Sequence, residues 1–168
     1  MMKKFCRVFF LLIFPIAAIA QSDTVKINSI KKQFTEINNN IASYKKIIKQ
    51  DTVKTTEGNE VTAWLDGTDI KKIIAIYYGE TGQSINEFYF TERRLIFYYS
   101  QLIHYKLPIN GGLPGAGKIG SIDKERYYFD KDLLIRHTSK PVKKLSVNEV
   151  RKEAKRLKYF MMSKNTIL

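Results

Sequence analysis

The sequence predicts an α+β fold: an antiparallel β-meander of about six strands, flanked by an N-terminal and a C-terminal amphipathic helix packed on one face of the sheet. Two observations lead to it. Between Val61 and Ser139, short apolar and aromatic runs are interrupted every eight to twelve residues or so by turn segments, which is typical of successive antiparallel strands. On both sides of this region, apolar residues recur at alternating steps of three and four, the period of a helix with one buried stripe.

The N-terminal helix is expected over Ser22–Gln50. Its apolar residues all fall on one stripe: Ile27, Ile30, Phe34, Ile37, Ile41, Tyr44 and Ile48. Ser22 or Asp23 can cap its start by accepting hydrogen bonds from free backbone amides. A stripe this long leaves open a coiled coil with a partner, but the main interpretation is a helix laid across its own sheet.

The C-terminal helix begins at a capping box, in which Ser146 and Glu149 satisfy each other's free backbone amides. Its apolar residues again step by three and four: Val147, Val150, Ala154, Leu157 and Met161. The pattern predicts a helix that runs to about Met162.

The expected strands are separated by turn residues. Asp66-Gly67 predicts a tight hairpin, because glycine accepts the positive φ that such turns need. The segment Asp130-Lys131-Asp132 predicts the last hairpin. The expected strands are 61–65, 70–78, 85–90, 95–105, 125–129 and 133–139.

Residues 1–20 have the pattern of a secretory signal peptide, which leaves 21–168 as a single α+β domain. A basic start is followed by the apolar run Val8–Ala20, which ends in Ala18-Ile19-Ala20 before Gln21. The run is too short to span a bilayer as a helix, although an uncleaved anchor is the alternative. We therefore expect export to the periplasm or the extracellular space, and no integral membrane protein after cleavage.

The only cysteine, Cys6, lies inside this predicted signal. A lipoprotein needs a cysteine directly after the cleavage site, and Gln21 stands there instead. We expect a soluble protein that is not a lipoprotein and that is held together by its hydrophobic core rather than by disulfides.

The formal net charge is +13, and the predicted signal accounts for three of these charges, which leaves +10. A basic protein favours anionic partners. An alternative explanation is genome composition, because 22 of the 29 basic residues are lysine and the chain is rich in Ile and Asn. Nucleic acid is not an expected partner, since binding to it conflicts with export.

No catalytic, nucleotide or metal site is predicted. The segment from Gly112 to Lys118 fits the spacing of a phosphate-binding loop, but Ile119 follows where serine or threonine is required, so segment 108–121 is interpreted as a flexible loop. His104 and His137 are too few for a structural zinc site without cysteine. Carboxylates gather near the last hairpin, at Asp123, Glu125, Asp130 and Asp132, and provide an alternative hypothesis of a hydrolase acting on envelope material.

Aromatic residues provide the strongest functional signal, because eight of the ten tyrosines lie between Tyr77 and Tyr128. Neighbouring strand residues point to opposite faces, so adjacent aromatics must occupy both. The inward set is expected to be Ala63, Ile74, Ile76, Phe88, Phe90, Tyr98, Phe129 and Ile135. Candidate ligand-binding residues on an open outer face are Trp64, Tyr77, Tyr89, Tyr99, Arg126, Tyr128 and Arg136, together with the outward Glu87.

The segments AWLDGTDIKKI, YYGETG, EFYF, LIFYY, RYYF and LIR resemble small exported proteins of unknown function from Bacteroidetes-type bacteria. The resemblance implies secretion and the α+β meander, and it implies no activity. From the residues themselves we expect a non-enzymatic exported binding protein without a cofactor. Its partner would be a protein or an anionic envelope polymer. The remaining alternative is an assembly subunit joined through the N-terminal helix.

Overall fold

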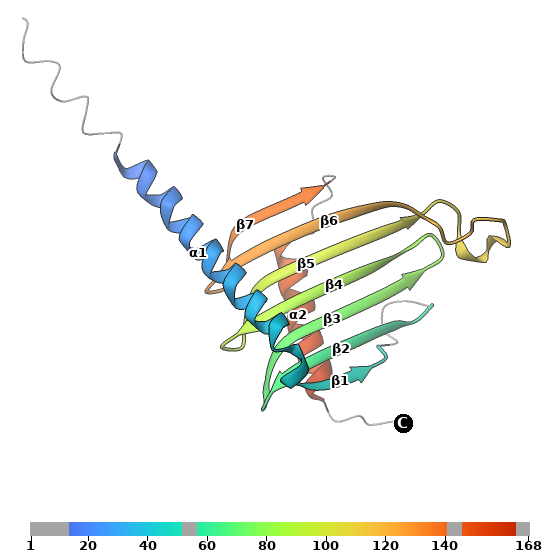
Figure 1. Cartoon of the computed structure of the whole chain (residues 1–168), viewed down its shortest axis with the longest axis horizontal. Coiled ribbons are helices and arrows are strands. Elements are labelled where there is room, and N and C mark those ends of the chain that lie inside the picture. Colours follow the sequence, from blue (N-terminus) through green and yellow to red (C-terminus); the bar gives the residue numbers. More distant parts are fainter. Residues whose placement is uncertain (1–13, 52–56, 141–145, 164–168) are drawn as a thin grey trace, which may run out of the picture.

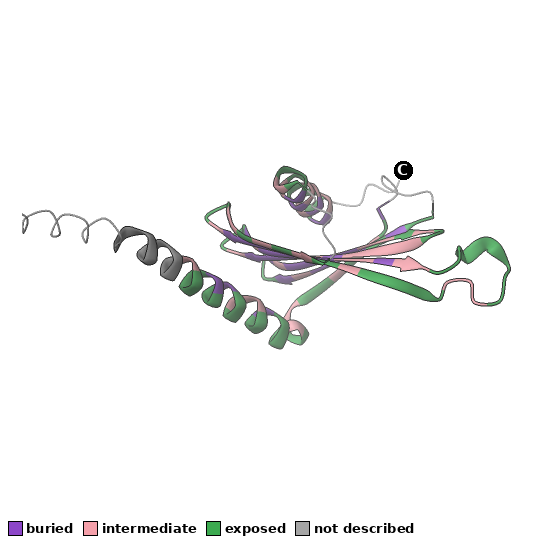
Figure 2. Cartoon of the chain, turned by 90° about the horizontal axis from the view of Figure 1, so that it is seen from above, coloured by how far each residue is buried: buried purple, intermediate pink, exposed green. Residues whose placement is uncertain are grey.

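The computed structural model describes residues 14–51, 57–140 and 146–163, with side chains from residue 23 onward. Its fold is α+β: an antiparallel sheet of seven strands lies between helix α1 (Phe14–Asn39) and helix α2 (Val147–Met162) (Figures 1 and 2). The strands lie side by side in chain order, as a meander. Their bounds are β1 Lys45–Lys49, β2 Asn59–Asp66, β3 Asp69–Gly79, β4 Gly82–Thr91, β5 Arg94–Tyr105, β6 Ile119–Asp130 and β7 Leu133–Lys140.

Tight turns connect most of the strands and confirm the predicted hairpins. Gly67 has a φ of 59° in the β2–β3 turn, where the sequence predicted a residue that tolerates positive φ. Lys131 and Asp132 adopt positive φ in the β6–β7 turn, and Glu92 and Arg93 do so in the β4–β5 turn. Because two successive left-handed residues match the twist of the paired strands, these short connections fix the register of the meander.

The prediction of one helix over Ser22–Gln50 is wrong at its C-terminal end. Helix α1 ends at Asn39, and residues 45–49 form β1, which pairs with β2. Asparagine side chains compete with the helix for backbone groups, and Asn40 donates its side-chain amide to the carbonyl of Glu36. The neighbouring β-branched Ile47 and Ile48 favour a strand. The apolar spacing continues past Asn39, but it no longer describes a helix.

The two helices lie on opposite faces of the sheet, so the prediction that they pack on one face is wrong (Figure 2). Helix α1 buries Ile27, Ile30 and Ile37 against Tyr89, Phe97 and Tyr128. Helix α2 buries Val150, Ala154, Leu157 and Met161 against a second set that includes Phe88, Tyr98 and Tyr127. The reason is the adjacent aromatic pairs, which place large apolar groups on both faces. A single covering layer would leave one of these sets in water.

A small polar cluster fixes the C-terminal end of α1 on the sheet. The ammonium of Lys72, on β3, lies 2.8 Å from a carboxylate oxygen of Glu87 on β4 and donates to the side-chain oxygen of Asn38 at 2.9 Å. The hydroxyl of Tyr89 donates to the same Glu87 carboxylate at 2.6 Å. Lys72 is buried, and these partners supply the hydrogen bonds that offset the cost of removing its ammonium group from water.

The predicted capping box at the start of α2 is confirmed. The Ser146 hydroxyl accepts from the Glu149 amide, and the Glu149 carboxylate accepts from the Ser146 amide. At the other end, the Lys49 ammonium on β1 donates to the carbonyls of Phe160 and Ser163. A cation at this position is favourable because the last carbonyls of a helix carry partial negative charge.

The signal-peptide prediction concerns a segment that the structure describes only in part. Residues 1–13 lie outside the described residues, and α1 begins at Phe14, inside the predicted signal. None of the helices in the described ranges has the length and apolar content that crossing a membrane requires.

Candidate functional site

The sheet extends beyond both helices, and this leaves part of its α1 side uncovered. Figure 1 shows α1 crossing the sheet obliquely, from the β6–β7 turn towards β1, with the β3–β4 turn and the long β5–β6 connection well away from it. The strand register places Ile76, Ile85, Ile103 and Ile122 on the α1 side of this free end. Of these four, Ile103 is buried, Ile76 and Ile85 are half-buried, and Ile122 keeps 38% of its surface exposed to solvent.

Strand β6 separates its charges between the two faces of the sheet. Lys124 and Arg126 point to the α1 side, in the same alternating row as Tyr128. Asp123 and Glu125, one position out of step, point to the α2 side. The α1 side of this strand therefore carries cations, and the α2 side carries carboxylates.

Strand β7 extends the cationic row. Lys140 lies opposite Lys124, and Arg136 lies opposite Tyr128, so both β7 residues share the α1 side. We call the surface formed by Tyr99, Lys124, Arg126, Arg136 and Lys140 the cationic face. None of its four cations has an ion-pair partner among the described residues. The charge is therefore available to an anionic group.

Tyr99 and Arg126 form the centre of the cationic face. They lie opposite each other on β5 and β6, and the guanidinium carbon of Arg126 lies 4.9 Å from the centre of the Tyr99 ring. At this distance the Arg126 cation interacts with the face of the Tyr99 ring, and the guanidinium carries several N–H donors that can bind an anionic group. Burial raises the pKa of Tyr99 above its usual value, and the charge of Arg126 partly offsets that effect. The phenol therefore remains a hydrogen-bond donor at neutral pH.

Only some of the predicted binding residues meet on this surface. Tyr99, Arg126 and Arg136 all lie on the cationic face. Tyr89 and Tyr128 share the same side of the sheet, but α1 covers them, and they are 3% and 6% exposed. The idea that all these aromatics lie on an open face is therefore wrong for Tyr89 and Tyr128, because the first helix packs directly on them.

The two remaining candidates lie elsewhere. Trp64 is half-buried on β2, with the ammonium groups of Lys46 and Lys72 each 5.9 Å from its ring centre. Tyr77 lies on the opposite side and donates its hydroxyl to Glu153 of α2 at 2.5 Å. Neither residue joins the cationic face.

The predicted inward set is correct for most members and wrong for three. Ala63, Phe88, Phe90, Tyr98 and Phe129 all belong to the core under α2. Ile74 and Ile76 lie on the α1 side instead, because Phe88 pairs with Ile73 and not with Ile74. Ile135 packs with the α1 core, next to the irregular pairing at Tyr128 and Phe129. A shift of one residue moves a side chain to the other face, and the sequence does not determine that register.

The carboxylates of the hydrolase hypothesis do not meet at one place. Asp130 pairs with Lys26 of α1 at 3.0 Å, whereas Asp123 pairs with His104 at 3.0 Å. These two aspartates are about 23 Å apart along β6, at roughly 3.3 Å per strand residue. Glu125 is buried and accepts a hydrogen bond from Tyr127 at 3.0 Å. Within the described residues, no group of three or more metal-ligating side chains is present.

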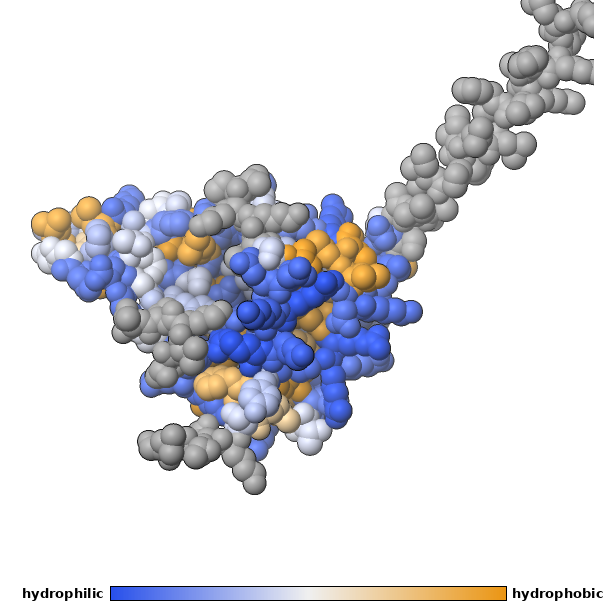
Figure 3. Space-filling view, turned by 180° about the vertical axis from the view of Figure 1, so that it is seen from behind, coloured by the Kyte–Doolittle hydropathy of each residue, from blue (hydrophilic) through white to orange (hydrophobic). Residues whose placement is uncertain are grey.

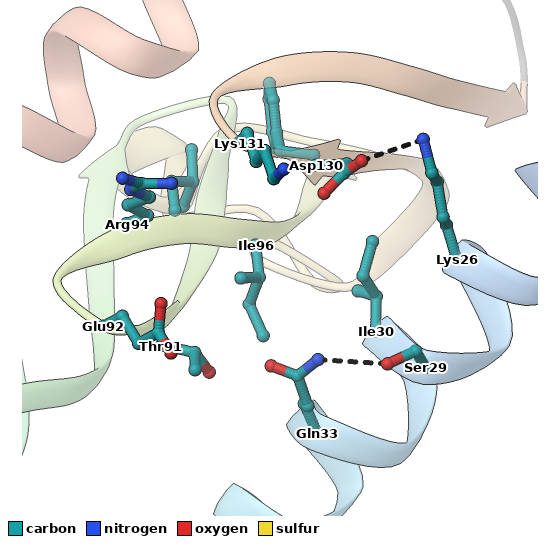
Figure 4. Close-up of a pocket in the computed structure, with 12 residues that line it drawn as sticks. Lys26, Ser29, Ile30, Gln33, Thr91, Glu92, Arg94, Ile96, Asp130 and Lys131 are labelled. Atoms are coloured by element: carbon teal, nitrogen blue, oxygen red, sulfur yellow. Dashed lines mark hydrogen bonds and ion pairs between the residues drawn. The ribbon is translucent and has the colours of Figure 1, made fainter.

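A pocket of about 290 Å³ lies between α1 and the β4–β5 and β6–β7 turns (Figure 4). The side chains of Ile30 and Ile96 form part of its apolar wall, and the Lys26–Asp130 pair lies at its edge. Its remaining charged residues are Glu92, Arg94 and Lys131, of mixed sign. With both signs present and Lys26 already paired, the pocket selects no class of charge, unlike the cationic face.

The glycine-rich connection leads into a strand, which distinguishes it from a phosphate-binding loop. A short 3₁₀ turn, Ile109–Gly111, precedes further turns, and the residues after Lys118 form strand β6. A phosphate-binding loop of this spacing leads into a helix, whose amino end faces the phosphates.

Lys124 and Lys140 were not among the predicted binding residues, although the sequence carries a signal for Lys124. In the run Asp123-Lys124-Glu125-Arg126, acid and base alternate, which in a strand sends each sign to its own face.

No known family model matches the chain, and neither a curated protein nor a solved structure matches it.

Proposed function

We propose that this chain is a non-enzymatic exported binding protein whose cationic face contacts an anionic polymer of the cell envelope. The observation that carries the proposal is the alternation along β6, which gathers Lys124 and Arg126 on one side of the sheet and sends Asp123 and Glu125 to the other. The net charge of the chain favours the same class of partner.

The geometry suits a polymer that carries repeated carboxylates or phosphates. Lys124 and Lys140 are directly opposite each other on neighbouring strands, so their Cβ atoms are roughly 5 Å apart. Arg126 lies one step further along β6 on the same side, where its planar guanidinium can bind one anionic group through two donors. Tyr99 adds flat apolar area with a polar tip, which suits a sugar ring or a peptide unit.

Binding to alginate, a carboxylate-bearing polysaccharide, tests the proposal, with uncharged dextran as the reference polymer. Lys124→Ala combined with Arg126→Ala should weaken alginate binding about thirtyfold, because roughly 1 kcal/mol is lost for each of the two contacts with an anionic group. The matched control is Lys152→Ala with Lys155→Ala, which removes two exposed cations from α2 on the other side of the sheet. Equal losses in the two double variants would show that net charge, and not this face, binds the polymer.

A further inference from the structure

The β5–β6 connection presents apolar side chains to solvent at the end of the molecule away from the start of α1. Leu107, Ile109, Leu113 and Ile119 are 36%, 50%, 57% and 53% exposed. Figure 3 shows apolar side chains gathered at this end, and Figure 1 shows the connection projecting beyond the sheet. We call residues 106–119 the apolar tip.

Hydrogen bonds within the apolar tip hold this arrangement. The amide of Ile109 donates to the carbonyl of Glu80 in the β3–β4 turn at 2.9 Å, and the Lys106 amide donates to the Lys118 carbonyl at 2.8 Å. The amide of Gly117 donates to the Leu107 carbonyl at 3.2 Å. A fixed backbone keeps the apolar side chains from folding back onto the sheet, so their exposure belongs to the native fold.

The charged residues within the apolar tip itself have one sign. Residues 106–119 contain Lys106 and Lys118 and no acid. One carboxylate, that of Glu80 in the β3–β4 turn, contacts the tip and accepts from the side-chain amide of Asn110 at 3.1 Å. The Lys118 side chain lies along the loop, within van der Waals distance of a methyl group placed on Gly115. Lys106 and Lys118 thus flank Leu107, Ile109 and Leu113 in the sequence, and all three apolar residues are exposed.

We propose that the apolar tip inserts into the surface of an anionic lipid bilayer. A narrow projecting loop can place its leucine and isoleucine side chains at the boundary between headgroups and acyl chains, while flanking lysines remain at the phosphates. Near an anionic membrane each lysine adds attraction, which falls off within a Debye length. This site is separate from the cationic face and goes beyond the proposed function.

Tryptophan fluorescence of the full chain tests the insertion directly. Leu113→Trp places a reporter in the tip, and Leu133→Trp places the control reporter at the start of β7, where Leu133 is 68% exposed. The spectrum of the unchanged chain, which contains Trp64, is subtracted from both. With phosphatidylglycerol vesicles we expect a blue shift and quenching by brominated acyl chains for Leu113→Trp alone. Both reporter variants carry the same N-terminal segment, so any contact of that segment with the vesicles affects them equally. A difference between their spectra therefore reports on the position of the tryptophan.

Three outcomes would overturn the proposal. The first is an unshifted Leu113→Trp spectrum in the presence of phosphatidylglycerol vesicles. The second is an equal shift for Leu133→Trp. The third is an equal response to phosphatidylcholine vesicles, which would remove the role of Lys106 and Lys118.

If the shift appears, Ile109→Ser combined with Leu113→Ser should lower vesicle binding, measured as the fraction that sediments with the lipid, by at least about fivefold relative to Leu133→Ser. The two proposals can fail separately. If the tip binds lipid but the double variant at Lys124 and Arg126 binds alginate as the unchanged chain does, the proposed function is refuted and the membrane proposal stands.

Discussion

Tyr127 and Tyr128 are neighbours on β6, yet they lie in the cores of two different layers. Tyr127 is fully buried under α2, and its ring centre lies 5.5 Å from that of Tyr98. Tyr128 is buried under α1, 4.9 Å from the ring centre of Phe97. One strand thus contributes to both cores, which makes the sheet the middle of three layers.

Truncation of Phe34 should show how much α1 contributes to the fold. Its ring stacks on Phe97 with centroids 4.4 Å apart and also contacts Tyr89. Phe34→Ala should lower the free energy of unfolding by about 3 kcal/mol, because it removes apolar contacts and leaves a cavity. The measurement is urea unfolding, with Val25→Ala as the control, since Val25 lies on α1 and is 65% exposed. A loss no greater than that of Val25→Ala would mean that α1 does not dock on the sheet in solution.

The pair formed by buried Lys72 and half-buried Glu87 should behave as a coupled unit. Lys72→Met leaves the half-buried Glu87 carboxylate without its cation, and we expect a loss of about 2 kcal/mol in the free energy of unfolding. Glu87→Gln, which leaves Lys72 uncompensated, should also destabilise. The double variant should lose less than the sum of the two single losses, because it leaves no uncompensated charge. Additive losses in this double-mutant cycle would contradict the pairing.

Stability should fall at alkaline pH because buried tyrosines resist ionisation. Burial raises the pKa of Tyr77, Tyr89 and Tyr98 well above the usual value, and the neighbouring carboxylates Glu153 and Glu87 add to the effect at Tyr77 and Tyr89. The fold therefore favours the neutral phenols. Their contribution is complete below the unfolded tyrosine pKa of about 10 and is lost as the pH rises above it, because the unfolded chain releases these protons first.

Tyr89→Phe tests this assignment, because it removes one of the three phenols. The free energy of unfolding, measured from about pH 8 to pH 11, should fall less steeply above pH 10 or so in this variant. The comparison uses slopes, since the loss of the Glu87 hydrogen bond changes stability at every pH. Parallel curves for the variant and the unchanged chain would show that Tyr89 ionises as freely in the folded state as in the unfolded one.

Local signals in the sequence identify most elements of the fold. Asp66-Gly67 gives the β2–β3 turn, Ser146 and Glu149 give the start of α2, and the isoleucine spacing gives α1 as far as Ile37. Beyond this point the spacing misleads, because Ile41 and Ile48 continue the helical step by coincidence. The competing signals are the asparagine run at residues 38–40 and the adjacent Ile47-Ile48, whose preference for a strand decides the structure.

The arrangement of layers depends on information that the sequence does not give residue by residue. Adjacent aromatics such as Tyr127-Tyr128 indicate that both faces carry apolar groups, but not which helix covers which face. Of the residues predicted to lie on the open face, Tyr99 and Arg126 are half-buried beside the α1 core, whereas Tyr89 is buried under α1. The two tyrosines differ in burial because of where α1 crosses β4 and β5. That position is set by tertiary packing and not by the local sequence.

Mapping of polymer contacts by nuclear magnetic resonance tests the central claim most directly. With isotope-labelled protein and alginate, the amide signals of Tyr99, Lys124, Arg126 and Lys140 should shift progressively with polymer concentration. Signals from the outer side of α2, such as those of Lys152 and Lys155, should remain in place. Shifts confined to α2, or unchanged spectra at the highest polymer concentration, would contradict the assignment of the cationic face as the binding surface.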